Sequence, residues 1–475
     1  MLCVSQFFFT PISPVPEKVK EQILTIPGVY LSARGPDRGS FRVHLNAAWI
    51  LEQFLHQSGL RFRVKAPPVP PPLKVLSQVP EIRDWVPDFL TLYQKEGLLF
   101  AIPKPGAHLW WPCGGGKTPP AIWWALAAPG LAIIITRGGA RRQFAGEIRR
   151  FSTVQPYMIE GLAPLDADEF EKAKAARIVL LGWETLSAHV DELVRMRPHS
   201  VVYDELHRAK AFRRSKRVVL GGGEEVARVR GEQVKAVLDG DTETAEQIVI
   251  PDGYKWVDLE NISASARKLS KVVRRRLGTS ATPVKNRLRD LWAILDLIEP
   301  WAHGPFSTWA KRYCAATPYL DHPGLDTSGV AAKPLIDELK ARLTFSVHAV
   351  SKEVTYRDLP PARFSVIHVP ASELNEPSTG FREELKEAQK HGGAAVLEVS
   401  LQQAASRKRR YCVERVMESL KDGQKVVVFT GRRKDCELFA EAVRKGIGKA
   451  KISCPFWTAH GDVSDVKREE MRVAY

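Results

Sequence analysis

The architecture of this chain can be derived from six consecutive residues, Cys113-Gly114-Gly115-Gly116-Lys117-Thr118. Glycines let a loop approach phosphate oxygens closely and turn its backbone N–H groups toward them. Lys117 is expected to reach the β- and γ-phosphates of a nucleotide, and the Thr118 hydroxyl to bind Mg²⁺. Residues 119–128, which begin with two prolines, predict a helix whose N-terminus faces the anion. The segment therefore predicts a phosphate-binding loop that leads into a helix.

One position departs from the usual form of such a loop, G-x-x-x-x-G-K-[ST]. Trp111 stands where the first glycine is expected. A glycine hinge beside an exposed lysine is therefore the alternative interpretation of this segment. A second pattern, farther along the chain, bears on the choice.

Two carboxylates follow a short apolar run in the segment Val201-Val202-Tyr203-Asp204-Glu205-Leu206-His207. Open α/β sheets place their ligand chemistry at the carboxyl ends of their strands. Asp204 is expected to hold Mg²⁺, directly or through water, and Glu205 to orient and deprotonate the attacking water. An acidic helix cap is the alternative for an isolated Asp-Glu pair, and the preceding glycine loop argues against it.

Apolar runs alternate with amphipathic segments beyond residue 85, which is typical of an α/β protein with a parallel sheet. Small hydroxyl residues end one of these runs, at residues 277–283 (LGTSATP). Residues 212–265 interrupt the alternation with glycines and an acidic stretch, and we expect an insertion there. The expected strands are 131–136, 177–181, 201–203, 276–279 and 425–430.

Composition and charge narrow the possible partners. The 475 residues are 44% apolar and 26% charged, as in a globular protein. Lys and Arg number 70 against 54 Asp and Glu, and the net charge of +16 favours nucleic acid as a partner, a solvated basic surface being the alternative.

Six scattered cysteines predict neither a zinc site nor disulfides, so a reducing cytosol is expected. The start of the chain does not read as a signal peptide, and the broken apolar run 121–135 argues against membrane insertion.

In this order, the patterns resemble the motifs of superfamily 2 helicases and translocases. Residues 113–118 resemble motif I, residues 204–207 a DEAH-type motif II with Leu206 in place of alanine, and residues 280–282 motif III. Residues 282–300 (TPVKN…LWAILDLIEP) resemble, more narrowly, the SWI/SNF-type branch of double-stranded DNA translocases. The resemblance implies tandem RecA-like lobes of the P-loop NTPase type, with ATP and Mg²⁺ as cofactors.

The resemblance also implies roles for single residues. Gln94, in the entry motif LYQKEG, is expected to read the adenine. Contacts to DNA phosphates are expected from Arg137, Thr185 and Asn286, with a solvated basic surface as the alternative for neighbouring arginines. Coupling of hydrolysis to movement is assigned to His207, Ser280, Ala281 and Thr282.

The expected organisation follows from these assignments. The second RecA-like lobe is expected to be incomplete, because no residue before Tyr475 can be assigned as the arginine finger of the family. We therefore expect either that the chain is a piece of a longer protein or that it is an incomplete ATPase that binds ATP and hydrolyses it poorly. The expected parts are a small α+β module resembling the HARP module (1–66), a proline-rich linker (67–84), a first RecA-like lobe (85–300), a helical protrusion and linker (301–394) and a partial second lobe (395–475).

The function expected from the sequence is ATP-dependent translocation on, or remodelling of, double-stranded or branched DNA. The expected location is the cytoplasm, or the nucleus of a eukaryote, with no membrane association. One alternative is a strand-separating helicase or the motor subunit of a restriction system. Another is a nucleotide-gated DNA-binding protein with little turnover.

Overall fold

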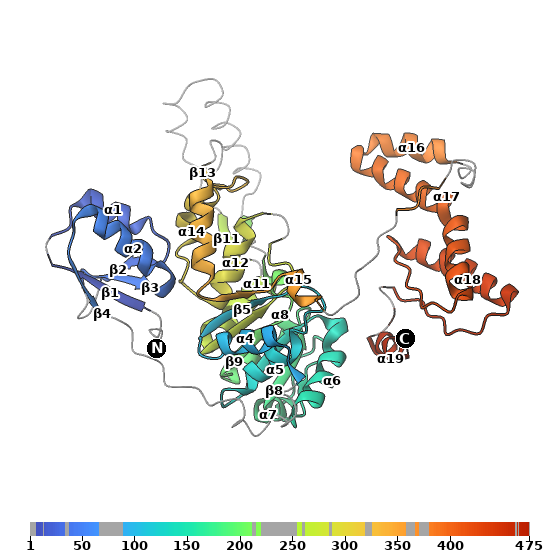
Figure 1. Cartoon of the computed structure of the whole chain (residues 1–475), viewed down its shortest axis with the longest axis horizontal. Coiled ribbons are helices and arrows are strands. Elements are labelled where there is room, and N and C mark those ends of the chain that lie inside the picture. The colour runs from blue at the N-terminus through green and yellow to red at the C-terminus, as the bar shows by residue number, and fades with distance from the viewer. Residues whose placement is uncertain are drawn as a thin grey trace. The chain divides into compact units, whose positions relative to one another are not determined.

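The computed structural model describes residues 6–12, 14–33, 38–65, 89–210, 215–219, 254–258, 262–284, 287–318, 325–357, 366–369, 380–460, 463 and 465–474 (Figure 1). The chain divides into two units, Met1–Asp358 and Leu359–Tyr475, and each has its own internal packing. Within the described ranges, no helix combines the length and the apolar character needed to cross a bilayer.

The first unit is built on a seven-stranded parallel sheet with the order β15-β5-β12-β9-β6-β8-β7. Four neighbouring inner strands are buried at every position, as expected for a parallel sheet that is covered on both faces. The predicted α/β fold class is confirmed, and four of the predicted strands lie in this sheet. The strands are β5 (Gly106–Trp110), β6 (Ala132–Thr136), β7 (Tyr157–Met158), β8 (Ile178–Gly182), β9 (Ser200–Tyr203), β12 (Arg275–Thr279) and β15 (Val347–Ala349).

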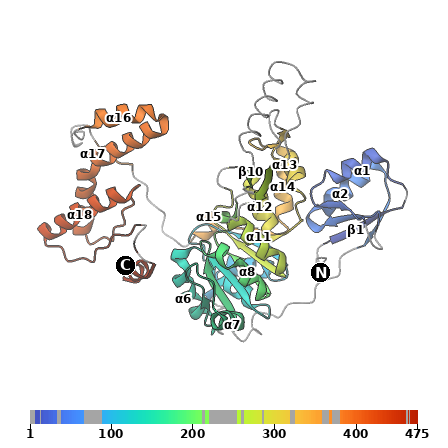
Figure 2. The same cartoon turned by 180° about the vertical axis from the view of Figure 1, so that it is seen from behind.

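Helices cover both faces of the sheet (Figures 1 and 2). Trp111, Trp123 and Trp124 are fully buried in the core of one face. That face packs against α4 (Leu92–Ala101), α5 (Thr118–Leu126) and α6 (Arg141–Phe151). The other face packs against α7 (Ala167–Ala175), α8 (Leu186–Arg195), α11 (Ile262–Val272) and α12 (Arg289–Ile298).

An antiparallel sheet with the order β2-β3-β1-β4 and two helices form the N-terminal module. Its core contains Phe9, Phe41 and Leu51. The α+β character predicted for this part is observed, whereas the linker predicted at 67–84 lies outside the described residues. The elements are β1 (Gln6–Pro11), α1 (Glu17–Leu24), β2 (Val29–Leu31), β3 (Phe41–His44), α2 (Leu45–Ser58) and β4 (Phe62–Lys65).

The segment after α12 is mainly helical. It contains α13 (Phe306–Tyr313), a short hairpin of β13 (Thr317–Pro318) and β14 (Leu325–Asp326), α14 (Lys333–Leu343) and α15 (Lys352–Thr355). Within the predicted insertion, β10 (Ser215–Val219) pairs antiparallel with β11 (Tyr254–Asp258), and α11 begins at Ile262. The other residues of the insertion lie outside the described ranges.

The second unit contains α16 (Phe381–Lys390), α17 (Gly393–Lys421), α18 (Arg433–Ala450) and α19 (Asp465–Ala474). The strand predicted at 425–430 is not formed, and Val427, Val428 and Phe429 are exposed. A parallel strand needs neighbours to satisfy its N–H and C=O groups, and the described part of this unit offers none. The prediction of a strand was therefore wrong for this structure, and a RecA-like second lobe remains a prediction.

Buried ionisable side chains gather where the module meets the first unit's sheet. His108 on β5 is fully buried, and its electrostatic neighbours are Glu299 and His303, which lie just after α12. His44 of the module interacts with the same two residues and with Arg342 of α14. Burial lowers the pKa of His108 and of His44 to about 4, so both imidazoles are neutral near pH 7.

Acidification is expected to destabilise the first unit through these histidines. An unfolded histidine has a pKa near 6.5, so the unfolded chain binds more protons than the folded one, and stability falls as the pH drops from about 6.5 to about 4. Lowering the pH from 7 to 5 should cost about 2 kcal/mol per histidine, measured by urea unfolding. His108→Gln should flatten this dependence and His56→Gln, on an exposed part of α2, should not; an equally steep dependence in His108→Gln would contradict the assignment.

Candidate nucleotide-binding and hydrolysis site

Three of the predicted segments leave neighbouring strands at one edge of the sheet. β5 leads into the glycine loop, β9 into the acidic pair, and β12, which lies between them, into the hydroxyl segment. The register places Leu109 beside Thr279 and Tyr203 beside Gly278, so the three strands end nearly level. Adjacent strands lie about 4.8 Å apart, which puts the strands of the glycine loop and of the acidic pair about 10 Å from each other. The structure therefore brings together segments that were predicted from separate patterns.

The glycine loop turns at Gly114 and Gly116, whose φ angles of +76° and +61° lie in the left-handed region. A Cβ atom at Gly116 would also lie 2.2 Å from Nε2 of Gln94. Among the described residues, no backbone oxygen accepts a hydrogen bond from the amides of Gly114, Gly116 and Lys117. Free amides before a helix N-terminus favour an anion. The loop therefore has the form that phosphate binding requires.

Gln94 supports this loop from the outside. Its side chain is buried, and its amide nitrogen donates to Gly115 O (3.3 Å) and to Gly116 O (3.1 Å). Its Oε1 accepts from Thr91 N (2.9 Å) in the capping box of α4, and the Tyr93 hydroxyl donates to Gly115 O (2.9 Å). Gln94 therefore contacts the predicted ATP-binding loop directly. Its recognition of the adenine base of ATP remains a prediction.

Lys117 is half-buried at the end of the loop. Its ammonium group donates to Trp111 O (3.2 Å) and to Pro112 O (2.9 Å), the two residues directly before the loop. Phosphate oxygens are stronger acceptors than carbonyl groups for a cation, so a bound nucleotide would compete well for this group. α5 begins at the next residue, with prolines in its first turn, and this confirms the helix predicted after the loop.

Asp204 is held from both sides. Its Oδ2 accepts from the Thr136 hydroxyl (2.8 Å) at the end of β6, and its Oδ1 accepts from the Thr279 hydroxyl (2.7 Å) at the end of β12. The Trp183 indole N–H donates to the Asp204 carbonyl oxygen (2.7 Å). Each carboxylate oxygen keeps lone pairs for a further ligand, so the carboxylate is held in a fixed orientation and can still bind a metal ion or accept another hydrogen bond.

The donors at this edge fit the predicted Mg²⁺. Thr118 opens α5 on the side of the glycine loop, and its hydroxyl donates to no other described residue. Together with the Asp204 carboxylate it would supply oxygen ligands of the kind that a hard cation prefers. These two residues would therefore hold the ion, which would neutralise charge on the phosphates.

Glu205 adopts a left-handed backbone conformation, with φ of +53°, directly after β9. Such a conformation costs about 1 kcal/mol for a residue with a side chain, so the surrounding packing must enforce it. His207 Nδ1 lies 3.3 Å from Glu205 Oε2 and 3.3 Å from the Ser280 hydroxyl, which in turn accepts from Thr282 N (3.2 Å). The acidic pair and the hydroxyl segment are therefore in contact, with Ala281 half-buried between Ser280 and Thr282.

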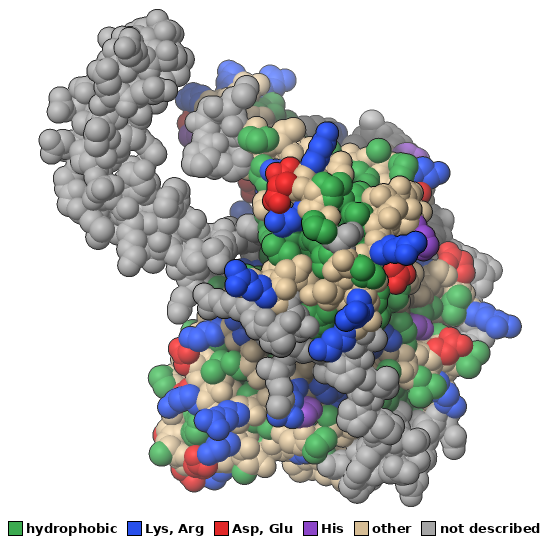
Figure 3. Space-filling view, turned by 90° about the vertical axis from the view of Figure 1, so that its left-hand side faces the viewer, with side chains coloured by type: hydrophobic (Ala, Val, Ile, Leu, Met, Phe, Trp, Pro, Cys, Tyr) green, Lys and Arg blue, Asp and Glu red, His purple; other side chains and the backbone are tan. Residues whose placement is uncertain are grey.

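Of the three residues predicted to contact DNA, one is exposed, one is buried and one lies outside the described residues. Arg137 is exposed and precedes the short 3₁₀ helix η2 (Gly138–Ala140) at the end of β6, next to the edge that carries the site. Thr185 is buried, and its hydroxyl donates to Gly182 O (3.0 Å). Asn286 lies outside the described residues. On the face shown in Figure 3, Lys and Arg side chains are dispersed among acidic and apolar ones.

Two residues that make contacts at the site were not predicted. Glu184 accepts from Gly138 N (3.0 Å) and forms an ion pair with Arg208 (2.9 Å), so it joins the segments that follow β6 and β9. The Tyr356 hydroxyl donates to Cys113 O in the glycine loop. Glu184 directly precedes Thr185, a predicted DNA contact, so its position in the sequence could have indicated that it lies near the site. No local pattern links Tyr356 to the glycine loop, which lies far away in the sequence.

A parallel sheet with a glycine loop and an acidic strand end separated by one strand defines a RecA-like fold of the P-loop NTPase class. The family model of the SNF2-related domain matches residues 257–424, and this match is consistent with an SNF2-type, helicase-like protein of superfamily 2. The match includes β12 and the hydroxyl segment, whereas the glycine loop and the acidic pair precede it. It supports membership of a superfamily of DNA-dependent ATPases, and with it nucleotide binding with a divalent metal and DNA as a partner. A comparison with curated proteins gives no match.

Proposed function

We propose that this protein is an ATP-dependent translocase of double-stranded DNA that couples ATP hydrolysis to movement along the duplex. The observation that carries the proposal is the meeting of the glycine loop, the acidic pair and the hydroxyl segment at one sheet edge, in a chain with an SNF2-related domain. A phosphate loop alone would support nucleotide binding. The acidic pair beside it adds the groups that hydrolysis needs.

The proposed chemistry is the transfer of the terminal phosphoryl group of ATP to water, which requires positioning and charge neutralisation. The glycine loop and Lys117 bind the phosphates, and Thr118 and Asp204 hold the metal ion. Glu205 accepts a hydrogen bond from the attacking water and takes its proton. Its strained backbone and the contact with His207 support this role, because both fix the direction of the carboxylate.

The proposed coupling runs from Glu205 through His207 to Ser280. His207 lies within 3.3 Å of both partners, so a change around Glu205 during hydrolysis alters the position of the hydroxyl segment. Residues 280–282 lead toward α12, which packs against one face of the sheet. Contiguous packed contacts of this kind can pass a small displacement to a larger element.

The proposed partner is held through its phosphates, because movement along DNA requires contacts that do not depend on sequence. The net charge of +16 and the exposed Arg137 beside the site support this mode of binding. Thr185 and Asn286 are kept as proposed contacts from the resemblance to the family, and a preference for branched DNA is proposed only from the N-terminal module.

ATP hydrolysis measured with four nucleic acids tests this function. Linear duplex DNA should stimulate the rate more than single-stranded DNA or RNA, branched duplex DNA should do so at least as well, and the stimulation should fall as salt rises. Displacement of a third strand from a triplex, without separation of the duplex, should accompany it. Stimulation by RNA alone would overturn the proposal, and efficient separation of duplex strands would favour a strand-separating helicase.

A further inference from the structure

One buried arginine joins the N-terminal module to the rest of the first unit. Arg342 lies in the last turn of α14 and is fully shielded from solvent. One of its terminal nitrogens donates to Pro27 O (2.7 Å) and Asn46 Oδ1 (3.1 Å) of the module. The same nitrogen donates to Ala302 O (3.2 Å), after α12. A single guanidinium group therefore ties the module to two elements that pack beside the large sheet.

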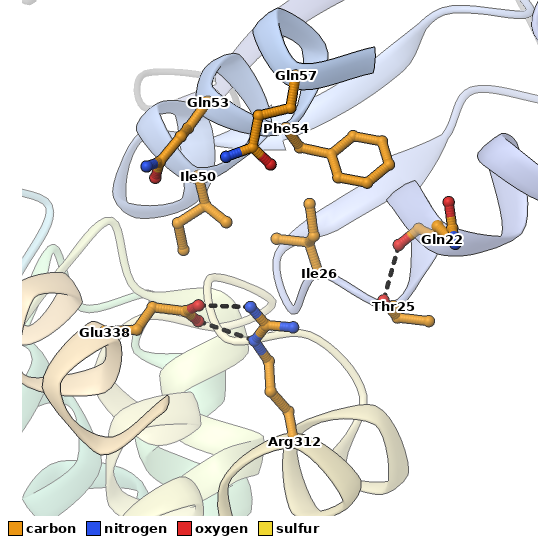
Figure 4. A pocket seen from close by; sticks show the side chains of 9 residues that line it. All are labelled: Gln22, Thr25, Ile26, Ile50, Gln53, Phe54, Gln57, Arg312 and Glu338. Carbon is orange, nitrogen blue, oxygen red and sulfur yellow. Dashed lines mark hydrogen bonds and ion pairs between the residues drawn. The ribbon is translucent and has the colours of Figure 1, made fainter. Parts of the chain in front are cut away.

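The other terminal nitrogen of Arg342 is held by a relay of polar groups. It donates to the Tyr313 hydroxyl (3.0 Å), which donates to Glu338 Oε1 (2.6 Å). Glu338 also pairs with Arg312, whose Nε donates to it at 2.8 Å, and this pair faces residues of α1 and α2 across a pocket of about 400 Å³ (Figure 4). Burying a charge is unfavourable unless its hydrogen-bond partners are in place, so the network is complete only when the module is docked.

The two backbones also touch directly beside Arg342. Gly28 of the module has φ of +88°, and a Cβ atom there would lie 2.5 Å from Ala302 O. Gly304 has φ of +71°, and its Cβ atom would lie 2.9 Å from Gly28 N. The Tyr30 hydroxyl donates to Trp301 O (2.6 Å) next to this contact. The junction is therefore a close fit of two turns, in which any side chain at either glycine would collide.

We propose that residues 6–65 are docked as a fixed part of the lobe that carries the large sheet, and that Arg342 is the side chain that holds them there. The proline-rich segment at 67–84 would by itself indicate a module on an independent tether. α14 leads into β15, which pairs with β5, so a force on the module reaches the strand that carries the glycine loop. The proposal rests on these contacts and does not depend on the translocase function.

Amide hydrogen exchange of the full chain tests the docking. In Arg342→Met, peptides that cover residues 26–31 and 301–304 should exchange roughly 100-fold faster than in the unaltered protein, because the junction opens. Peptides from β6 and β8 should keep their protection, which shows that the large sheet is still folded. Lys340→Met is the matched control, because it removes an exposed cation from the same helix and should leave both junction peptides unchanged.

A second variant keeps the proposal testable if Arg342→Met unfolds the lobe. Tyr30→Phe removes only the hydroxyl that donates to Trp301 O, and the same two peptides should exchange about 5-fold faster, with β6 and β8 unaffected. Unchanged exchange at the junction in a folded Arg342→Met, or in Tyr30→Phe when the arginine variant does not fold, overturns the proposal.

Discussion

Lys117→Ala should abolish nucleotide binding. The lysine is the only side-chain cation within the glycine loop, and its ammonium group donates to the carbonyl groups of the two residues directly before that loop. Hydrogen bonds to charged groups contribute about 1.5–3 kcal/mol each, so loss of contacts to two phosphates should weaken ATP binding by roughly 100-fold to 10,000-fold. Equilibrium binding of a fluorescent ATP analogue measures this change directly.

The matched control is Lys95→Ala, which removes an exposed lysine from α4 next to Gln94. It should bind the analogue as the unaltered protein does. Binding of unaltered strength by Lys117→Ala would show that the glycine loop is a hinge, and the assignment of the nucleotide site would fail with it.

Glu205→Gln should keep ATP bound and stop its hydrolysis. Glutamine keeps the size of the side chain and its ability to contact His207, but it cannot accept a proton from water. General bases of this kind contribute about 10²-fold to 10⁴-fold to the rate, so turnover should fall by that factor while the affinity for ATP is nearly unchanged. Single-turnover hydrolysis and equilibrium binding, measured on the same preparation, separate the two effects.

Glu147→Gln on α6 is the control, because it makes the same chemical change at a residue of the lobe that belongs to none of the predicted segments. Its turnover should equal that of the unaltered protein. Normal turnover by Glu205→Gln would mean that another group orients the water, and the role proposed for the strained residue after β9 would be wrong.

The glycine loop and the acidic pair could be predicted because each is encoded by a few consecutive residues at the end of a strand. The strand that carries the loop was missed, since β5 reads Gly-Ala-His-Leu-Trp, and glycine and alanine are poor strand formers. β15 was missed as well, because a strand of three residues is defined by its pairing with β5 rather than by a pattern of its own. Local sequence patterns therefore predicted the residues that carry the chemistry. The strands that position these residues are defined by pairing between distant parts of the chain.

The surroundings of Asp204 show the same limit. Thr136 and Thr279 end two separate strands, and each looked like an ordinary strand-end hydroxyl in the sequence. Only the strand order, with β9 between β6 and β12, reveals that both hydroxyls meet one carboxylate. The docking by Arg342 could not be predicted either, because its partners Pro27 and Asn46 lie about 300 residues earlier in the chain.

The order of strands in the large sheet has a consequence for biosynthesis. β5 leaves the ribosome early, but its two neighbours, β12 and β15, end only at Thr279 and Ala349. The edges of β5 therefore stay unpaired in the nascent chain, and must be shielded, until β12 and β15 have been synthesised. Chains with unpaired strand edges associate wrongly and bind chaperones. Slower translation or growth in the cold would lengthen that interval, so the yield of intact protein depends on how the cell protects a half-made sheet.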